Sequence, residues 1–200
     1  MGKFFLLLIF TFFSLVAISS TLETLGLIVR GEYSKTDSSA QLKNSPLLPG
    51  KNSTVYISQG YGRTEFAQIR LAGKRHNGID IPAKLGTPVL TPTKGKVMAV
   101  GNQELYCPRR GYGKFVIVES DKSDFFFLFA HLSKISVKEN QDLDLKEKIG
   151  EVGRTGLSTA PHLHFSVFKK DGFRMDQENG CGPNPKGKDV NPVPVLESLG

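Results

Sequence analysis

The sequence of 200 residues contains no tryptophan, only two cysteines and only four histidines. It also lacks any stretch of a dozen residues with apolar side chains at helical spacing, which argues against a helical protein. It has no basic repeat and no recognisable nucleic-acid-binding motif, so we expect no nucleic-acid partner. The rest is ordinary for a folded domain, because 39% of the residues are hydrophobic and 22% are charged. This composition excludes a disordered chain.

The longest hydrophobic run lies at the start of the sequence. Residues 4–18 read FFLLLIFTFFSLVAI after Lys3, and Ala17 and Ser19 are small enough to precede a cleavage point. We therefore expect residues 1–20 to be a secretory signal peptide. An uncleaved membrane anchor is the alternative, since the run is only a little shorter than the roughly 20 residues that span a bilayer. No cysteine follows the run, which argues against a lipoprotein anchor. In either case we expect the folded part to be exported, to the periplasm, the cell surface or the medium.

The formal net charge of +7 could attract an anionic polymer such as a cell wall. Solubility is the simpler interpretation of a basic surface without clustered charges, and we favour it.

The two cysteines, Cys107 and Cys181, lie in stretches rich in glycine and proline, LYCPRRGYG and NGCGPNPKG. Export would permit a disulfide, which would join these two loops. Metal ligation is the alternative, but neither cysteine lies at short ligand spacing from the other or from a histidine. We therefore favour the disulfide.

Three segments are expected along the chain. Residues 1–20 form the leader, residues 21–50 are polar without a sustained period and predict a linker, and residues 51–200 have the size of one domain. In this domain short runs with strand character alternate with turns that contain glycine or proline. Strands are expected at 55–58, 87–91, 96–100, 114–119, 125–130, 149–152 and 162–168. The sequence thus predicts an all-β domain, with VNPVPVLESLG as a proline-rich tail along its surface.

The run FFFLFA at 125–130 is continuously apolar. It could be a membrane-seeking patch, but an apolar run of this length is more often a strand buried on both faces. We expect burial.

The first candidate site is RHNGIDIP, which contains His76 and Asp80. Gly78 and Pro82 argue against a helix here. In an extended chain, residues four apart point to the same face, so the imidazole and the carboxylate can converge on one point. Taken alone the signal is weak, because a surface histidine beside an aspartate in a turn is commoner than a metal pair.

The second candidate site is PHLHF, in which His162 and His164 share one face of the expected strand and Leu163 points to the other. Two half-exposed strand histidines are the alternative. If both are buried instead, they require partners, and a metal and a polar cleft would supply them. His131 follows the strand 125–130 at the rim of the sheet, where functional groups are common, although for this residue taken alone we favour a surface or capping role.

Together these residues predict a zinc site. Catalytic zinc usually takes three protein ligands plus a water, and histidine nitrogen and aspartate oxygen are among its ligands. His76, Asp80 and one of the pair His162 and His164 provide that set. The two remaining histidines are then available for proton transfer or for stabilising charge. Two neutral imidazoles and one carboxylate leave net positive charge on the metal, which would acidify its water.

The same motifs resemble a known family. The H-x-x-x-D of HNGID, the A-H-L of FAHLS and the H-x-H of PHLHF are similar to those of the LytM/lysostaphin-type zinc metallopeptidases, which cut peptide cross-links of bacterial peptidoglycan. The similarity covers about residues 55–196. It includes SQGYGR, GTPVLTPTKGKVMAVG, GYGKFVIVES and GEVGRTGLSTAPHLHFSV in the family's order.

The resemblance implies a fold and a set of roles. The fold would be a compact antiparallel β-sheet or sandwich domain of the lysostaphin-like, duplicated hybrid motif type, with long loops and the site in a groove. His76, Asp80 and His164 would bind one zinc ion, and His131 and His162 would be the catalytic pair beside it. One of this pair would take a proton from water and the other would stabilise the oxyanion.

The resemblance also implies a function, a zinc endopeptidase acting on peptidoglycan peptides. The alternatives are a non-catalytic relative that activates cell-wall amidases and a wall- or glycan-binding module that needs no zinc. Some relatives have lost zinc ligands and act as regulators, whereas this chain keeps all five site residues, which favours the enzyme. We expect a monomer that contacts a membrane only through an uncleaved N-terminal segment.

Two departures from the family are visible. Members often have tyrosine two residues before the A-H-L histidine, where this chain has Phe129, so a hydroxyl is absent there. The segments NQELYCPRR and FRMDQENGCGPNPKGKD are longer than the usual connections and contain the two cysteines. We hypothesise that a bond between Cys107 and Cys181 ties these loops near the groove and narrows the choice of substrate.

Overall fold

The structure is a computed structural model that describes residues 41–43, 54–70, 75–177 and 181–199. The expected leader and most of the expected linker lie outside these residues. In the part of the chain that is described, no helix is both long enough and apolar enough to cross a membrane.

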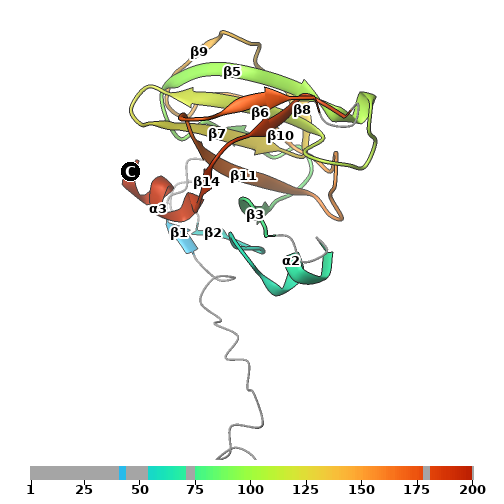
Figure 1. Ribbon diagram of the computed structural model, residues 1–200. Helices are drawn as coiled ribbons and strands as arrows, with labels where there is room; N and C mark the ends of the chain where they lie inside the picture. The colour runs from blue at the N-terminus through green and yellow to red at the C-terminus, as the bar shows by residue number, and fades with distance from the viewer. Residues whose placement is uncertain (1–40, 44–53, 71–74, 178–180, 200) are drawn as a thin grey trace, which may run out of the picture. The chain divides into compact units, whose positions relative to one another are not determined.

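Antiparallel β-strands are the main regular structure of the described chain (Figure 1). The main sheet has seven strands, hydrogen-bonded in the order β14, β11, β7, β6, β5 and β9, and β3 pairs additionally with β11. These strands are β3 (Ile79–Pro82), β5 (Gly95–Asn102), β6 (Lys114–Ser120), β7 (Phe125–Ala130), β9 (Asp142–Leu143), β11 (His162–Lys169) and β14 (Asp189–Val190). The prediction of an all-β antiparallel domain is confirmed.

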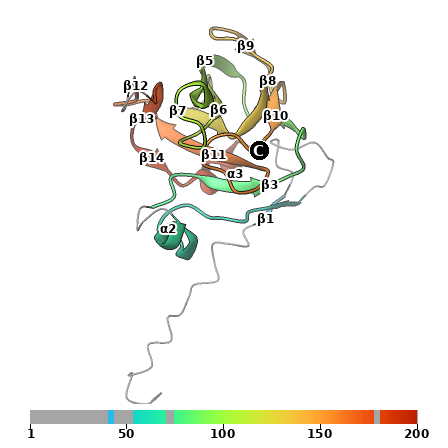
Figure 2. The same cartoon turned by 90° about the vertical axis from the view of Figure 1, so that its right-hand side faces the viewer.

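Smaller sheets and short helices complete the described part, and Figure 2 shows them from a second side. A three-stranded sheet joins β4 (Pro88–Leu90), β10 (Lys148–Val152) and β8 (Leu132–Ile135). Two strand pairs are β1 (Gln41–Lys43) with β2 (Thr54–Tyr56) and β12 (Arg174–Asp176) with β13 (Asn184–Lys186). The helices are α2 (Glu65–Arg70), the 3₁₀-helix η1 (Gln103–Leu105) and α3 (Pro192–Ser198). Strand β1 lies inside the segment that was expected to be a linker.

Most of the expected surface tail VNPVPVLESLG forms the helix α3, which was not predicted. The Asn191 side chain caps the helix by accepting a hydrogen bond from the Val193 N–H at 3.1 Å, and Pro192 occupies the first turn, where its missing N–H costs nothing. Leu196 is buried against the core. The two prolines near the start of this helix made the segment read as an irregular tail. The Asn191 cap and a proline in the first turn in fact favour a helix.

Strand β7 supplies the centre of the core, and its expected burial on both faces is confirmed. Phe127 and Phe129 pack in one apolar cluster, and Phe126 and Leu128 pack in a second cluster. The strand lies between β6 and β11 in the sheet, so the hydrophobic effect favours apolar side chains on both of its faces.

Strand β11 is paired along both of its edges. One edge pairs with β7, and the other pairs first with β3 and then with β14. In this register His164 lies opposite Asp80 on β3 and opposite Ala130 on β7, the residue before His131. The sheet therefore brings three of the predicted site segments side by side.

Candidate metal centre

Three side chains converge on one point. His76 Nε2 lies 3.2 Å from Asp80 Oδ1, His164 Nδ1 lies 2.9 Å from the same oxygen, and the two nitrogens are 3.1 Å apart. All three side chains are at least 85% buried, with exposed fractions of 7%, 15% and 6% for His76, Asp80 and His164. These are the three residues that the resemblance implies as metal ligands.

The convergence follows from strand pairing. Asp80 and His164 are direct cross-strand partners, and side chains opposite one another in an antiparallel pair lie close on one face. His76 reaches the same face through a bridge to Gly62, in which each N–H bonds the other carbonyl at 2.8 and 2.7 Å. A side chain at Gly78 would place its Cβ 2.4 Å from the Phe165 carbonyl oxygen, so only glycine lets this segment approach β11 so closely.

The outward ring nitrogens of both histidines are held by hydrogen bonds. His76 Nδ1 donates to the carbonyl of Gly60 at 2.8 Å, which leaves a lone pair on Nε2. His164 Nε2 is 2.8 Å from the hydroxyl of Ser166, and donation to that hydroxyl leaves a lone pair on Nδ1. Metal-binding histidines typically donate their other N–H in this way.

This donor set fits a zinc ion. Two nitrogen lone pairs and a carboxylate oxygen that face one another repel unless a cation lies between them. Ligands about 2.0–2.2 Å from a tetrahedral zinc are roughly 3.3 Å apart, close to the observed 2.9–3.2 Å. Among the described residues, this is the group of histidine, cysteine, aspartate and glutamate that could hold a metal.

His131 and His162 lie beside this group. Their ring centroids are 4.7 Å apart, and the His131 ring is 5.6 Å from that of His164. His162 Nε2 is 3.6 Å from Asp80 Oδ1. Three of the four histidines therefore lie within 3.6 Å of one aspartate oxygen, and the fourth, His131, packs beside two of them.

Each of these two histidines also has one nitrogen bound by backbone. His131 Nδ1 donates to the Thr155 carbonyl at 2.7 Å, and His162 Nδ1 donates to the Ala160 carbonyl at 2.8 Å. Because a carbonyl can only accept, both rings carry their proton on Nδ1 when neutral. Nε2 of each ring is thus left with a lone pair that can accept a proton.

His131 is held in an uncommon backbone conformation. It links β7 and β8 with φ of 61°, a left-handed value that costs a residue other than glycine about 1–3 kcal/mol. Its N–H donates to the Tyr112 carbonyl at 2.9 Å. Such a conformation persists only where neighbouring residues impose it. Here the left-handed backbone of His131 directs its ring toward the cluster.

The protein groups alone keep Asp80 ionised. Burial raises its pKa, but hydrogen bonds and positive charge from His164 and His76 outweigh burial and hold the pKa of this carboxyl well below its usual value. For His76 the signs are opposite. Burial lowers its pKa, but the hydrogen bond and negative charge of Asp80 outweigh burial and raise the pKa of His76 above its usual value.

Burial disfavours protonation of the other two buried histidines of the cluster. Burial, together with the charges of His164 and His162, lowers the pKa of His131 to about 3. Burial also lowers the pKa of His164. Neutral imidazoles can ligate a metal or accept a proton, so both directions suit the cluster's chemistry.

Several partners of the site were not predicted. The carbonyls of Gly60, Ala160 and Thr155 carry no side-chain signal that a sequence could reveal. Ser166 could have been found, because it lies two residues after His164 and strand alternation places it on the same face. Tyr112, whose hydroxyl accepts a hydrogen bond from Asn77 Nδ2 at 2.6 Å, has no motif of its own. Burial raises the pKa of Tyr112 to about 12, so its hydroxyl stays neutral.

The segment before His76 is fastened to β14. Arg75 Nη1 and the Tyr61 hydroxyl each lie 2.5 Å from Asp189 Oδ1, and the guanidinium lies 4.5 Å from the centroid of the Tyr61 ring. Through these contacts, Tyr61 and Arg75, which precede His76, are linked to β14, the strand that also pairs with β11.

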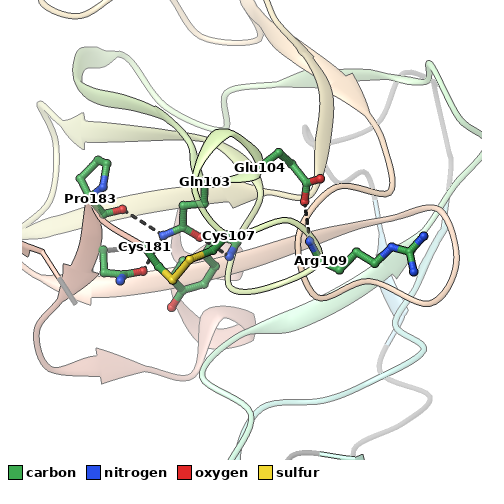
Figure 3. Close-up of a disulfide and its surroundings, with 8 residues drawn as sticks. Gln103, Glu104, Cys107, Arg109, Cys181 and Pro183 are labelled. Atoms are coloured by element: carbon green, nitrogen blue, oxygen red, sulfur yellow. Dashed lines mark hydrogen bonds between the residues drawn. A yellow bond between two sulfur atoms is a disulfide. The ribbon is translucent and has the colours of Figure 1, made fainter. Parts of the chain in front are cut away.

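The two cysteines are joined in a disulfide, with Cα atoms 5.3 Å apart (Figure 3). The bond links the segment after η1 to the segment before β13. Glu104 extends this connection, because its Oε1 accepts from the Gly156 N–H at 2.5 Å, next to the Thr155 carbonyl that holds His131. The linked segments thus lie beside the site. Phe129, where the family often has tyrosine, is fully buried in the core and packs on Phe165.

The chain was compared with known proteins. The model of peptidase family M23 matches residues 74–191. The peptidoglycan DD-endopeptidase ShyA of Vibrio cholerae is 35% identical over 93 residues, 46% of this chain and 20% of ShyA. The murein hydrolase activator NlpD of Escherichia coli is 30% identical over 121 residues, 60% of this chain and 26% of NlpD. This chain covers about a fifth to a third of the first curated relatives.

The fold is also found among solved structures. The catalytic domain of the antimicrobial peptidase lysostaphin from Staphylococcus simulans superposes with a TM-score of 0.55 and 26% identity, over 72% of this chain and 92% of that domain. All five clustered residues lie inside the range matched by the family model.

Proposed function

Because the chain belongs to peptidase family M23, we propose that it is a zinc-dependent endopeptidase that hydrolyses peptide cross-links of bacterial peptidoglycan. One observation carries the proposal: three donor atoms on His76, Asp80 and His164 meet within 3.2 Å of one another, and two further histidines present free nitrogens beside them. A purely structural metal site would be closed by four protein ligands, whereas three donors leave a position for water or substrate.

We assign one zinc ion to His76 Nε2, Asp80 Oδ1 and His164 Nδ1. When bound, zinc supplies the Lewis acid that polarises a scissile carbonyl and acidifies a water. The residues around it fix the donors, because Gly60 and Ser166 hold the outward ring nitrogens and prevent the rings from turning.

His131 and His162 are assigned to proton transfer. Each ring keeps its proton on Nδ1, so Nε2 can accept a proton from an attacking water. Once protonated, the same nitrogen can donate to the departing amine or stabilise the oxyanion by a charged hydrogen bond. The Thr155 and Ala160 carbonyls stabilise the protonated rings, since they accept from the N–H on the far side.

The relationship to NlpD supports a second candidate, a non-catalytic activator of cell-wall amidases. An activator needs neither a metal nor a proton-transferring histidine. This chain keeps three donors and two histidines in one cluster, and that retention favours the enzyme.

The surroundings of the enzyme complete the proposal. Residues 51–200 are proposed to be the catalytic domain, residues 21–50 a linker, and residues 1–20 a signal peptide or anchor. By their names, ShyA is a peptidoglycan endopeptidase and NlpD is an activator of murein hydrolases, which supports an exported location in the periplasm, on the cell surface or outside the cell. We propose that the enzyme acts as a monomer.

Digestion of purified peptidoglycan by the full chain tests the proposal. We expect soluble muropeptides with newly freed amino groups, loss of their release after chelation, recovery on adding zinc, and loss in His131→Ala. The matched control is Ser136→Ala, a conservative change outside the cluster. Release that persists in chelator, or in His131→Ala, would contradict the mechanism. Stimulation of a cell-wall amidase by a His164→Ala variant, without hydrolysis by the wild type, would instead establish the activator.

A further inference from the structure

The segment that runs from Gln103, the first residue of η1, to β6 is held at its base by side-chain hydrogen bonds. The Gln103 side chain is almost fully buried, and its amide nitrogen donates to the Pro183 carbonyl at 3.0 Å and to Asn184 Oδ1 at 2.5 Å. Its amide oxygen accepts from the Tyr112 N–H at 2.7 Å. Figure 3 shows this carboxamide beside the disulfide, pointing toward Pro183. One buried amide thus connects the start of the segment, its end and the strand β13.

Tyr112, at the end of this segment, contacts three separate parts of the cluster. Its carbonyl accepts from the His131 N–H at 2.9 Å. Its hydroxyl accepts from Asn77 Nδ2 at 2.6 Å, and Asn77 is the residue after His76. Its ring centroid lies 5.7 Å from that of His164, at a tilt of 43°.

These contacts restrict movements of His76 and His164 that would displace their ligand nitrogens from the metal position. A catalytic constellation must be held within about 0.5 Å, and this requires neighbours that lock its rotamers. The aromatic ring limits rotation of the His164 imidazole, and the hydroxyl fixes the turn that carries His76. Gln103 in turn fixes Tyr112, so the support does not depend on an exposed loop.

We propose that Tyr112 is a positioning residue of the metal centre, which holds the two histidine ligands in the geometry that binds the ion. The inference rests on the assignment of a metal to this cluster in the proposed function, but it does not require that the substrate be peptidoglycan. Metal affinity, and not only hydrolysis, therefore reports on it.

Two substitutions separate the hydroxyl from the ring. Tyr112→Phe removes the bond to Asn77, and Tyr112→Leu also removes the ring beside His164, while both keep the backbone carbonyl. The matched control is Tyr106→Phe, which makes the same chemical change on the same segment at a side chain that is 66% exposed.

Cobalt(II) binding to the full chain is the measurement, by competition with a chromophoric chelator and by the visible d–d spectrum. Loss of a supporting contact around a metal ligand typically costs 10–100-fold in affinity. We expect about tenfold weaker binding for Tyr112→Phe and about 100-fold for Tyr112→Leu with an altered spectrum, and affinity within about twofold of wild type for Tyr106→Phe.

Thermal unfolding in excess chelator distinguishes positioning from general stability. A positioning role predicts that Tyr112→Phe unfolds in chelator at nearly the wild-type temperature although its cobalt affinity is reduced. Wild-type affinity and spectrum in both Tyr112 variants would overturn the inference, as would an equal loss in Tyr106→Phe or a metal-free stability loss large enough to explain the weaker binding. Cobalt binding that depends on Tyr112 in a chain without peptidoglycan hydrolysis would refute the proposed substrate and leave this inference intact.

Discussion

At the scale of the residue, the strand register places His162 and His164 in different surroundings. Both project from the same face of β11, but only His164 lies opposite Asp80 in the register and within 3.1 Å of the His76 nitrogen. His162 approaches the same carboxylate less closely, at 3.6 Å, and is tethered to the Ala160 carbonyl instead. One intervening residue therefore gives the two histidines different surroundings, which suits the proposed roles of His164 as a metal ligand and His162 as a proton carrier.

Substitution of each histidine should reveal this division. We expect His162→Ala and His164→Ala each to lower hydrolysis by at least about 100-fold, the usual contribution of a proton-transferring side chain. Only His164→Ala should lose most of its zinc, because it removes one of three donors. Elemental analysis of the purified variants, beside a muropeptide release assay, measures both effects. A zinc-free His162→Ala variant would contradict the assignment of roles.

Much of the cluster could be predicted from sequence at this scale, because its chemistry resides in uncommon side chains at fixed spacing. The spacing of His76 and Asp80, and of His162 and His164, needs only an extended backbone to bring each pair to one face. Spacing could not show that both pairs share a sheet edge, and it could not reveal backbone acceptors. Hydrogen bonds to carbonyls depend on tertiary packing, which no local pattern encodes.

At the scale of the element, long apolar strands could be predicted and short polar ones could not. The limits of β7 were predicted to the residue, because its run is apolar without interruption. Strands β3, β8 and β14 have two to four residues each, too few to display a period. Their positions are decided by the neighbours with which they pair, and helix α3 was likewise hidden by its prolines.

Removal of the disulfide should lower the stability of the folded chain. Cys107 and Cys181 are separated by 74 residues, so the bond removes a large loop-closure entropy from the unfolded chain. We expect a variant with Cys107→Ser and Cys181→Ser to lose about 2–4 kcal/mol of unfolding free energy in urea denaturation. Reduced wild-type protein should behave as the double variant does. Two titratable thiols in the denatured, unreduced protein would show that the bond is absent.

At the scale of the whole molecule, burial of neutral histidines makes folding sensitive to acid. The pKa of His131 is lowered to about 3, whereas an unfolded histidine titrates near 6.5. The unfolded chain therefore binds the proton first, so the stability from this group is complete above pH 6.5 and is lost as pH falls toward 3. His164 acts in the same direction. The raised pKa of His76 does not offset this, because its stabilisation is already complete below pH 6.5.

Protein stripped of metal should thus lose stability on acidification. Between pH 6.5 and 5, we expect His131 alone to lower the unfolding free energy by about 2 kcal/mol. Urea denaturation in chelator at the two pH values measures it. His131→Gln keeps a donor for the Thr155 carbonyl but does not titrate, so its stability should depend less on pH by about this amount. An unchanged pH dependence in His131→Gln would contradict the prediction.

The two-sided pairing of β11 makes a bound metal an indicator of correct folding. Side chains on a strand alternate with a period of two, so a slip of one residue would turn His162 and His164 to the face of β11 that now carries Leu163 and Phe165, and would bring Leu163 and Phe165 to the face of the cluster. Such a molecule could contain the same amount of β-structure and yet have no metal site. The zinc-to-protein ratio of a refolded preparation should therefore count the molecules whose strands are in register, which circular dichroism cannot do.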